Sequence, residues 1–212
     1  MVLRTGGITN SPGAFTGGGT GNKAILGIAG FDGLPLASLA SIAFSWTNVV
    51  GPGGPFYSPP SGGNTTVPWV NVLVDFNPAG PSDIRILVLM DSSLSPAISG
   101  SVGSYTNLGN TITHSWTSAV NVMIVSSPPN PAPGGILPNL SVGPTWPSNS
   151  YKFSSLVAAN PQAVLRDCYP ADNGMLAGAV LPAILLCSGD SGNVTKSGKR
   201  IRALAVNGIS RI

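Results

Sequence analysis

The sequence contains no glutamate, only four lysines and a single histidine, and charged residues make up 8% of its 212 positions. Helices of soluble proteins usually carry Glu, Lys, Gln and Arg on their exposed faces, whereas strands and turns favour Thr, Asn, Gly and Pro. The scarcity of the first group argues against a helical protein. Hydrophobic residues still make up 42% of the chain, so it has the material for a core, and its composition predicts an all-β protein.

Several other features are missing, and each excludes a class of protein. No uninterrupted stretch of about 18 apolar residues occurs, which excludes a membrane-spanning helix. Residues 1–10 lack the apolar centre of a signal peptide. Two cysteines cannot supply the ligands of a structural zinc site. No glycine-rich loop follows a strand and opens a helix, so nucleotide binding has no support.

The net charge of +3 is concentrated near the C-terminus, where half of the ten cationic residues fall within the last seventeen positions. A nucleic-acid-binding protein usually shows a basic arm or a basic face with interleaved aromatic residues, and this chain shows neither. We therefore expect no nucleic-acid partner and interpret the cations as the protection of a solvated edge strand. They are Lys196, Lys199, Arg200, Arg202 and Arg211.

Short apolar runs of five to ten residues, rich in β-branched side chains and bounded by Pro, Gly, Asn or Asp, predict a series of strands. Long segments rich in proline and glycine separate some of these runs and must cross the surface as loops. The expected strand regions are 24–31, 41–50, 68–76, 83–91, 110–116, 120–127, 163–169, 183–190 and 201–208.

One short helix is predicted over 153–162, with Ser154 as its N-cap and Pro161 as its stop. With strands in hairpin-like succession and no alternating helices, the pattern predicts a single-domain, two-sheet antiparallel β-sandwich of jelly-roll or concanavalin-like type. Residues 1–23 are rich in Gly, Ser and Thr and are expected to form a flexible or extended N-terminal arm, leaving 24–212 as the sandwich domain.

The two cysteines, Cys168 and Cys187, lie in two of the predicted strands. A disulfide between them would close a loop of about twenty residues and contribute roughly 3 kcal/mol in the chain-entropy model. Such a bond predicts an oxidising compartment, and hence a protein that is extracellular or on a cell or virion surface. The alternative is a pair of buried thiols that act as small hydrophobic residues.

The hexapeptide Cys187–Gly192, CSGDSG, resembles the nucleophile loop of the chymotrypsin-like serine proteases. The resemblance implies Ser191 as the nucleophile and His114 as its base. Asp167 or Asp172 would orient the histidine. However, His114 lacks the Ala-Ala-His-Cys context of that family, and only 21 residues follow Ser191. We therefore interpret the hexapeptide as a strand that ends in a polar turn, and we assign no catalytic residue.

The segment DFNPAGPSD, residues 75–83, resembles the D-x-[DN]-x-D-G-x-x-D calcium loop of integrin-type propeller repeats. Asp75, Asn77 and Asp83 occupy ligand positions and Gly80 the position of the turn glycine. Ala79 stands where the family has a carboxylate. Because calcium takes about six to eight oxygen ligands, we predict weak calcium binding or none. The alternative is a plain hairpin turn without a cofactor.

Three classes of function remain, and the first is an extracellular, non-catalytic recognition module for carbohydrates. Aromatic side chains on loops can stack on sugar rings, and Asp and Asn side chains can bind hydroxyl groups. Trp46, Trp69 and Trp116 lie in strand-like runs and are expected in the core. The predicted glycan-binding residues are Trp146, Tyr151, Tyr57, Asp190 and Asn193.

The second class is a structural subunit of a self-assembling filament, capsid or surface layer. Low charge, an extended arm and proline-rich loops favour self-association. The third class is a hydrolase or lyase that uses either Ser191 or a pair of carboxylates drawn from Asp167, Asp172 and Asp190. The composition and motifs place recognition slightly ahead of assembly, and both ahead of catalysis.

Overall fold

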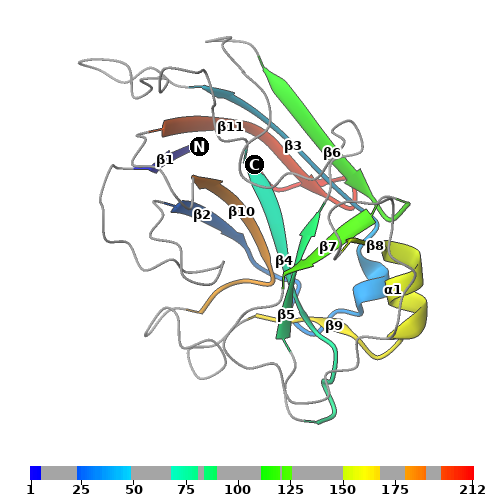
Figure 1. Cartoon of the computed structure of the whole chain (residues 1–212). Helices are drawn as coiled ribbons and strands as arrows, with labels where there is room; N and C mark the ends of the chain where they lie inside the picture. The colour runs from blue at the N-terminus through cyan, green and yellow to red at the C-terminus, as the bar shows by residue number, and fades with distance from the viewer. Residues whose placement is uncertain are drawn as a thin grey trace.

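The computed structural model describes residues 1–5, 23–48, 68–80, 84–89, 111–119, 121–125, 150–167, 180–189 and 197–212 (Figure 1). Within them, short strands dominate and a single α-helix occurs. The elements are β1 (Val2–Thr5), β2 (Lys23–Ile28), the 3₁₀ helix η1 (Leu36–Ser38), β3 (Ser41–Asn48), β4 (Trp69–Asp75), β5 (Ile84–Leu89), β6 (Ile112–Thr117), β7 (Asn121–Val125), β8 (Ser150–Lys152), α1 (Phe153–Ala159), β9 (Val164–Leu165), β10 (Ile184–Gly189), β11 (Ser197–Val206) and β12 (Ile209–Ser210).

The strands form two sheets whose paired strands are all antiparallel. The first sheet has the order β1-β11-β3-β6, with β12 beside β11. The second sheet has the order β2-β10-β4-β5-β7-β8, with β9 beside β4. Figure 1 shows α1 at one end of this arrangement, next to β8. The prediction of an all-β, two-sheet antiparallel sandwich with one short α-helix is confirmed.

The strand pairs are nested along the chain. The outermost pair is β1 with β11, followed inward by β2 with β10, β3 with β6 and β4 with β5. The β11–β3 and β10–β4 pairs complete two four-stranded sheets. This nested pairing is jelly-roll wiring, and it favours the jelly-roll over the concanavalin-like alternative. β7 and β8 widen the second sheet beyond β5.

The first sheet shows the alternation expected of a sheet with one buried face. On β6, His114 and Trp116 are buried, while Thr113, Ser115 and Thr117 are exposed. The inward residues of β3 and β11 join the same core, which fills the space between the sheets. A bulge between Ile201 and Ala203 adds one residue to β11. The buried residues Ile201 and Leu204 are therefore three positions apart instead of two.

The second sheet is buried on both faces. All six residues of β5 are buried. Alternate residues of β4, β5 and β10 face the core between the sheets, and apolar residues at intervening positions form a separate group on the opposite face, here called the outer cluster. The ring of Pro182 packs over the same face of β2, because Gly27 has no side chain there. The outer cluster consists of Leu73, Ile84, Ile86, Val88, Leu181, Leu185 and Cys187, with Ile25 packed against it.

Two details of the predicted elements differ from the structure. Helix α1 begins at Phe153 with Lys152 as its N-cap, and no side chain caps it. Ser154 is therefore the second residue of the helix and not its cap, because the helix starts directly where β8 ends. The helix ends at Ala159, with Asn160 as its C-cap, and so stops before Pro161, as predicted. Within the predicted N-terminal arm, β1 pairs with β11 as an outer strand of the first sheet.

The basic strand near the C-terminus is not an edge strand. β11 pairs with β1 on one side and with β3 on the other, and both partners meet it at Lys199 and Arg200. Arg200 and Arg202 are exposed. The interpretation as edge protection is therefore wrong for Arg200 and Arg202. Their side chains are exposed because one face of the first sheet is open to solvent along β11.

Candidate functional site

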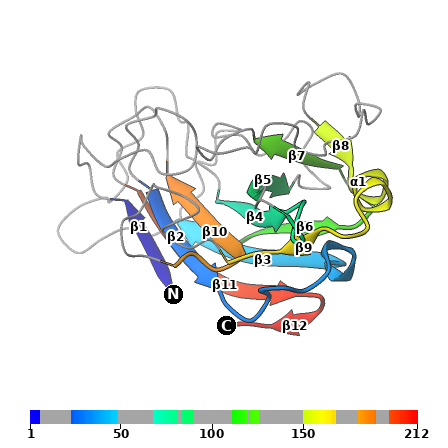
Figure 2. The same cartoon turned by 90° about the horizontal axis from the view of Figure 1, so that it is seen from below.

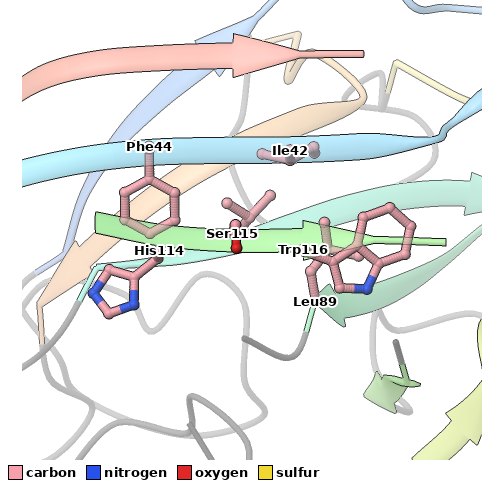
Figure 3. A pocket seen from close by; sticks show the side chains of 7 residues that line it. Ile42, Phe44, Leu89, His114, Ser115 and Trp116 are labelled. Carbon is pink, nitrogen blue, oxygen red and sulfur yellow. The ribbon is translucent and has the colours of Figure 1, made fainter. Parts of the chain in front are cut away.

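A small hollow lies next to β6 and is lined by residues of both sheets (Figure 3). Its volume of about 10 Å³ admits roughly one water molecule. Pockets for small ligands usually measure about 300 to 1,000 Å³, so the hollow is a packing gap and not a sugar-sized site. Its lining comes from Ile42 and Phe44 on β3, Val70 on β4, Leu89 on β5, and His114, Ser115 and Trp116 on β6.

His114, the proposed base of the protease-like arrangement, is buried in an aromatic group. Its side chain is 3% exposed, its ring is stacked on Trp46 with centroids 6.3 Å apart, and its centroid lies 5.1 Å from that of Phe44. His114 belongs to the first sheet, whereas Asp167 follows β9 in the second sheet, and Figure 1 shows β6 and β9 apart. The structure does not bring these two residues together. Ser191 and Asp172 lie outside the described residues.

The carboxylates of Asp32 and Asp167 hold loop backbones together. Asp167 Oδ1 accepts a hydrogen bond from the N–H of Ala183 at 2.8 Å. Asp32 Oδ1 accepts one from the N–H of Asp167, also at 2.8 Å. These bonds connect the turn after β2 with the residues that follow β9 and precede β10. Asp167 therefore has a structural role here, and a carboxylate pair with Asp172 or Asp190 stays a prediction, since both lie outside the described chain.

The predicted calcium loop begins as a turn built by Asp75. This residue ends β4, is 2% exposed, and its Oδ1 accepts a hydrogen bond from the N–H of Asn77 at 2.9 Å. The N–H of Gly80 donates to the carbonyl of Asn77 at 3.0 Å. This is the Asx-type turn chemistry of the hairpin alternative. Asp83 lies outside the described residues, so the calcium prediction remains untested.

Of the five predicted glycan-binding residues, the structure describes only Tyr151. It lies on β8, where it is half-buried and packed against the core. Trp46 and Trp116 are buried, as predicted, and Trp116 meets Phe153 of α1 edge to face at 4.8 Å. Trp69 lies on β4. The other four predicted residues, Trp146, Tyr57, Asp190 and Asn193, lie outside the described part of the chain.

Cys187 belongs to the outer cluster and is 1% exposed. Its thiol donates a weak hydrogen bond to the carbonyl of Leu185, with sulfur and oxygen 3.8 Å apart. This environment fits the alternative of a buried thiol that packs as a small hydrophobic residue. Cys168 is not among the described residues, so the structure adds no support for the predicted disulfide.

Two contacts that the sequence did not predict lie next to β12. They join the segment between β2 and β3 to the residues before and after this strand. At one point the Arg211 guanidinium lies 4.7 Å from the centroid of the Phe31 ring. At the other, the side chain of Asn207 accepts the N–H of Ala40 and donates to the carbonyl of Ser38, each at 2.8 Å.

Each of these two segments also carries an exposed apolar side chain. Leu34 is 41% exposed and Ile209 is 60% exposed. Asp32 and Arg211 are also exposed on the same two segments. The signal that could have located the β11–β12 hairpin is the Asn-Gly pair at 207–208, because this dipeptide after a strand is a strong indicator of a hairpin.

No family model, curated protein or solved structure matches this chain. Within the described ranges, no helix has the length and hydropathy needed to cross a membrane.

Proposed function

We propose that this protein is a structural subunit that associates with copies of itself into a larger assembly. The observation that supports this proposal best is a jelly-roll sandwich with very few charges. Charged residues make up 8% of the chain, whereas about 25% is usual for soluble domains. Jelly rolls occur in capsid subunits and in lectins, so the fold by itself allows both assembly and recognition.

The exposed surface of the first sheet favours assembly. Along β6, the outward residues are Thr113, Ser115 and Thr117, and Ala203 lies on the exposed side of β11. These side chains are short and uncharged, while Arg200 and Arg202 are exposed elsewhere on β11. Covering the β6 part of this surface with another subunit immobilises few rotatable bonds and desolvates few charges, and both of these costs normally oppose association.

Glycan recognition remains a second proposal, and its predicted residues lie mostly in loops outside the described chain. It requires the loop aromatics Trp146 and Tyr57 to be exposed and to stack on sugar rings. For either function we expect the protein to act outside the cell or on a cell or virion surface. Assembly ranks first because the outward side chains along β6 are short and uncharged.

The test is to measure the mass of the purified protein by size-exclusion chromatography with light scattering. Samples should span about a hundredfold range of concentration, because association rises with concentration by mass action. Negative-stain images of the largest species should show rings, shells or filaments. A protein that stays monomeric throughout and is retained on a polysaccharide column would replace assembly with recognition. A monomer that no polysaccharide retains would contradict both proposals.

A further inference from the structure

The bulged part of β11 presents two arginines on the open face of the first sheet. Arg200 and Arg202 are exposed, whereas Ile201 between them is buried in the core. The register with β3 passes from Ile201 to Ala203, so Arg202 is the extra residue of the bulge. Bulges are common next to active sites, where they redirect a side chain. Here the bulge leaves Arg202 and Ala203 both exposed before the strand returns to the core at Leu204.

The strands of the first sheet contain no acidic residue. The chain has no glutamate, and none of its seven acidic residues lies in β1, β3, β6, β11 or β12. β1 and β11 pair with each other and hold four of the ten cationic residues. These are Arg4, Lys199, Arg200 and Arg202. The described acidic residues, Asp32, Asp75 and Asp167, each accept a backbone N–H elsewhere in the fold. The arginine pair therefore has no carboxylate on its own sheet.

We infer that Arg200 and Arg202 bind the sulfate groups of an acidic polysaccharide that lies against β11. The planar guanidinium of arginine presents paired N–H groups that match the oxygen atoms of such anionic groups. With a rise of about 3.3 Å per residue, the two side chains start roughly 7 Å apart along the strand. This spacing suits successive anionic groups of a polymer better than one small ion. The inference goes beyond the proposed assembly and does not depend on it.

The residues beside the arginines suit a sugar polymer. Ala203 pairs in register with Ser45, and Ser45 pairs with Thr113 on β6. The side chains in this row are short, so a polymer can approach the sheet closely. Thr113 is exposed, and its hydroxyl can both donate a hydrogen bond to a sugar hydroxyl and accept one from it. The open face therefore offers cations for sulfate groups and a hydroxyl for the sugar itself.

Other anionic polymers fit this face less well. Single-stranded nucleic acids stack their bases on aromatic side chains, whereas Phe44, Trp46 and Trp116 on β3 and β6 are buried in the core. Salt-sensitive binding to duplex DNA commonly uses about six to ten phosphate contacts, more than the cations of β1 and β11 supply. An acidic protein would also need an apolar centre for its contact, and the exposed residues Ala203 and Thr113 are small or polar.

The experiment measures the Kd for heparin, a heavily sulfated polysaccharide, by calorimetric titration of the full chain. Arg200→Ala and Arg202→Ala should each weaken binding by about tenfold, because each removes a charge-assisted contact. The double variant should bind more weakly than either. Arg200→Lys should fall between Arg200→Ala and the unmodified protein, since lysine keeps the charge and loses the two-point geometry. Both arginines are exposed, so the melting temperature should not change.

The matched control is Lys152→Ala. Lys152 is exposed on β8, and Figure 2 shows β8 far from β11. This variant loses one positive charge, as each arginine variant does, but it should bind heparin like the unmodified protein. Desulfated heparin should bind the unmodified protein much more weakly than heparin, because the arginines then lack their anionic partners.

Each contrary result has a distinct meaning. If the unmodified protein does not bind heparin even at low salt, the inference is wrong. If the double arginine variant binds as tightly as the unmodified protein, the arginine pair is not the site. If desulfated heparin binds equally well, the contact is not with sulfate. If a single-stranded oligonucleotide or polyglutamate displaces heparin at lower concentration than heparin itself, that polymer class replaces the polysaccharide as the partner.

Discussion

The outer faces of the two sheets of this jelly roll differ in how far they are buried. The first sheet alternates along β6 between buried aromatic residues and exposed Thr and Ser. The second sheet is apolar on both faces, and every residue of β5 is buried. One face of the second sheet packs against the first sheet, and the other carries the outer cluster. The first sheet therefore has one buried face and the second has two, and both sheets contribute to the core between them.

This difference shows how the strand pattern reports burial. Strict alternation, as in THSWT at 113–117, indicates a sheet with one face in water. A continuous apolar run, as in ILVL at 86–89, indicates burial on both sides. The two sheets should also respond differently to substitution on their outer faces, and the following predictions test this from the largest expected effect to the smallest.

Adjacent leucines on β10 should be equally sensitive to truncation. Leu186 faces the core between the sheets and Leu185 lies in the outer cluster, and both are 0% exposed. We expect Leu186→Ala and Leu185→Ala each to reduce the free energy of unfolding by about 2–5 kcal/mol, because each leaves a cavity. Chemical denaturation measures both. If Leu185→Ala costs less than about 1 kcal/mol, the outer cluster is not a second core.

The next effect concerns the polar contacts that hold the end of the first sheet. Asn207 has φ of 52° in the turn between β11 and β12, and its side chain makes hydrogen bonds to Ser38, Ala40 and Ser41. Asn207→Ala should lower the free energy of unfolding by about 1–3 kcal/mol, since it removes these bonds and strains the turn. Asn207→Gly is the control, because glycine accepts the backbone conformation and should recover part of the loss.

A smaller effect of opposite sign is expected at Asn71. This residue is 2% exposed on the outer side of β4, paired in register with Leu185 and Val88. Its Oδ1 is buried and has no hydrogen-bond partner among the described residues. Asn71→Leu should therefore raise the free energy of unfolding, by about 0.5–2 kcal/mol. Thermal and urea denaturation should agree on the sign. A net loss of stability would show that the amide is satisfied.

The smallest effect should occur on the exposed face of the first sheet. Thr113 is exposed on β6, next to the buried His114. Thr113→Ala should change the free energy of unfolding by no more than about 0.5 kcal/mol, because surface substitutions remove few contacts. Urea denaturation of the monomer measures this. A loss comparable with that of Leu185→Ala would mean that the outer faces of the two sheets are equally buried.

Much of the fold could be predicted from local patterns. The strand regions around Trp46, Val72 and Leu186 were located correctly, because β-branched and aromatic runs between turn residues are strong signals. Shorter strands were missed. β1, β8 and β12 have four, three and two residues, and segments of this length are stabilised by the strand they pair with and not by their own sequence.

The candidate sites were less predictable, because chemistry-bearing residues have structural uses that spacing does not reveal. Asp75 and Asp167 appeared as possible metal or catalytic groups, and in the structure each accepts a backbone N–H. His114 appeared as a possible base, and it packs between aromatic rings. Local sequence indicates that a carboxylate or an imidazole is present. Local sequence does not indicate which backbone or side-chain group that carboxylate or imidazole will contact.

By itself, the sequence determined the all-β class, the main strands and the low surface charge, because these depend on composition and on periodicity over a few residues. The tertiary structure decided the jelly-roll pairing, the double burial of the second sheet and the contact of Arg211 with the Phe31 ring. These features join residues far apart in the chain. Their stability depends on contacts that exist only after both sheets have formed, so no local pattern could specify them.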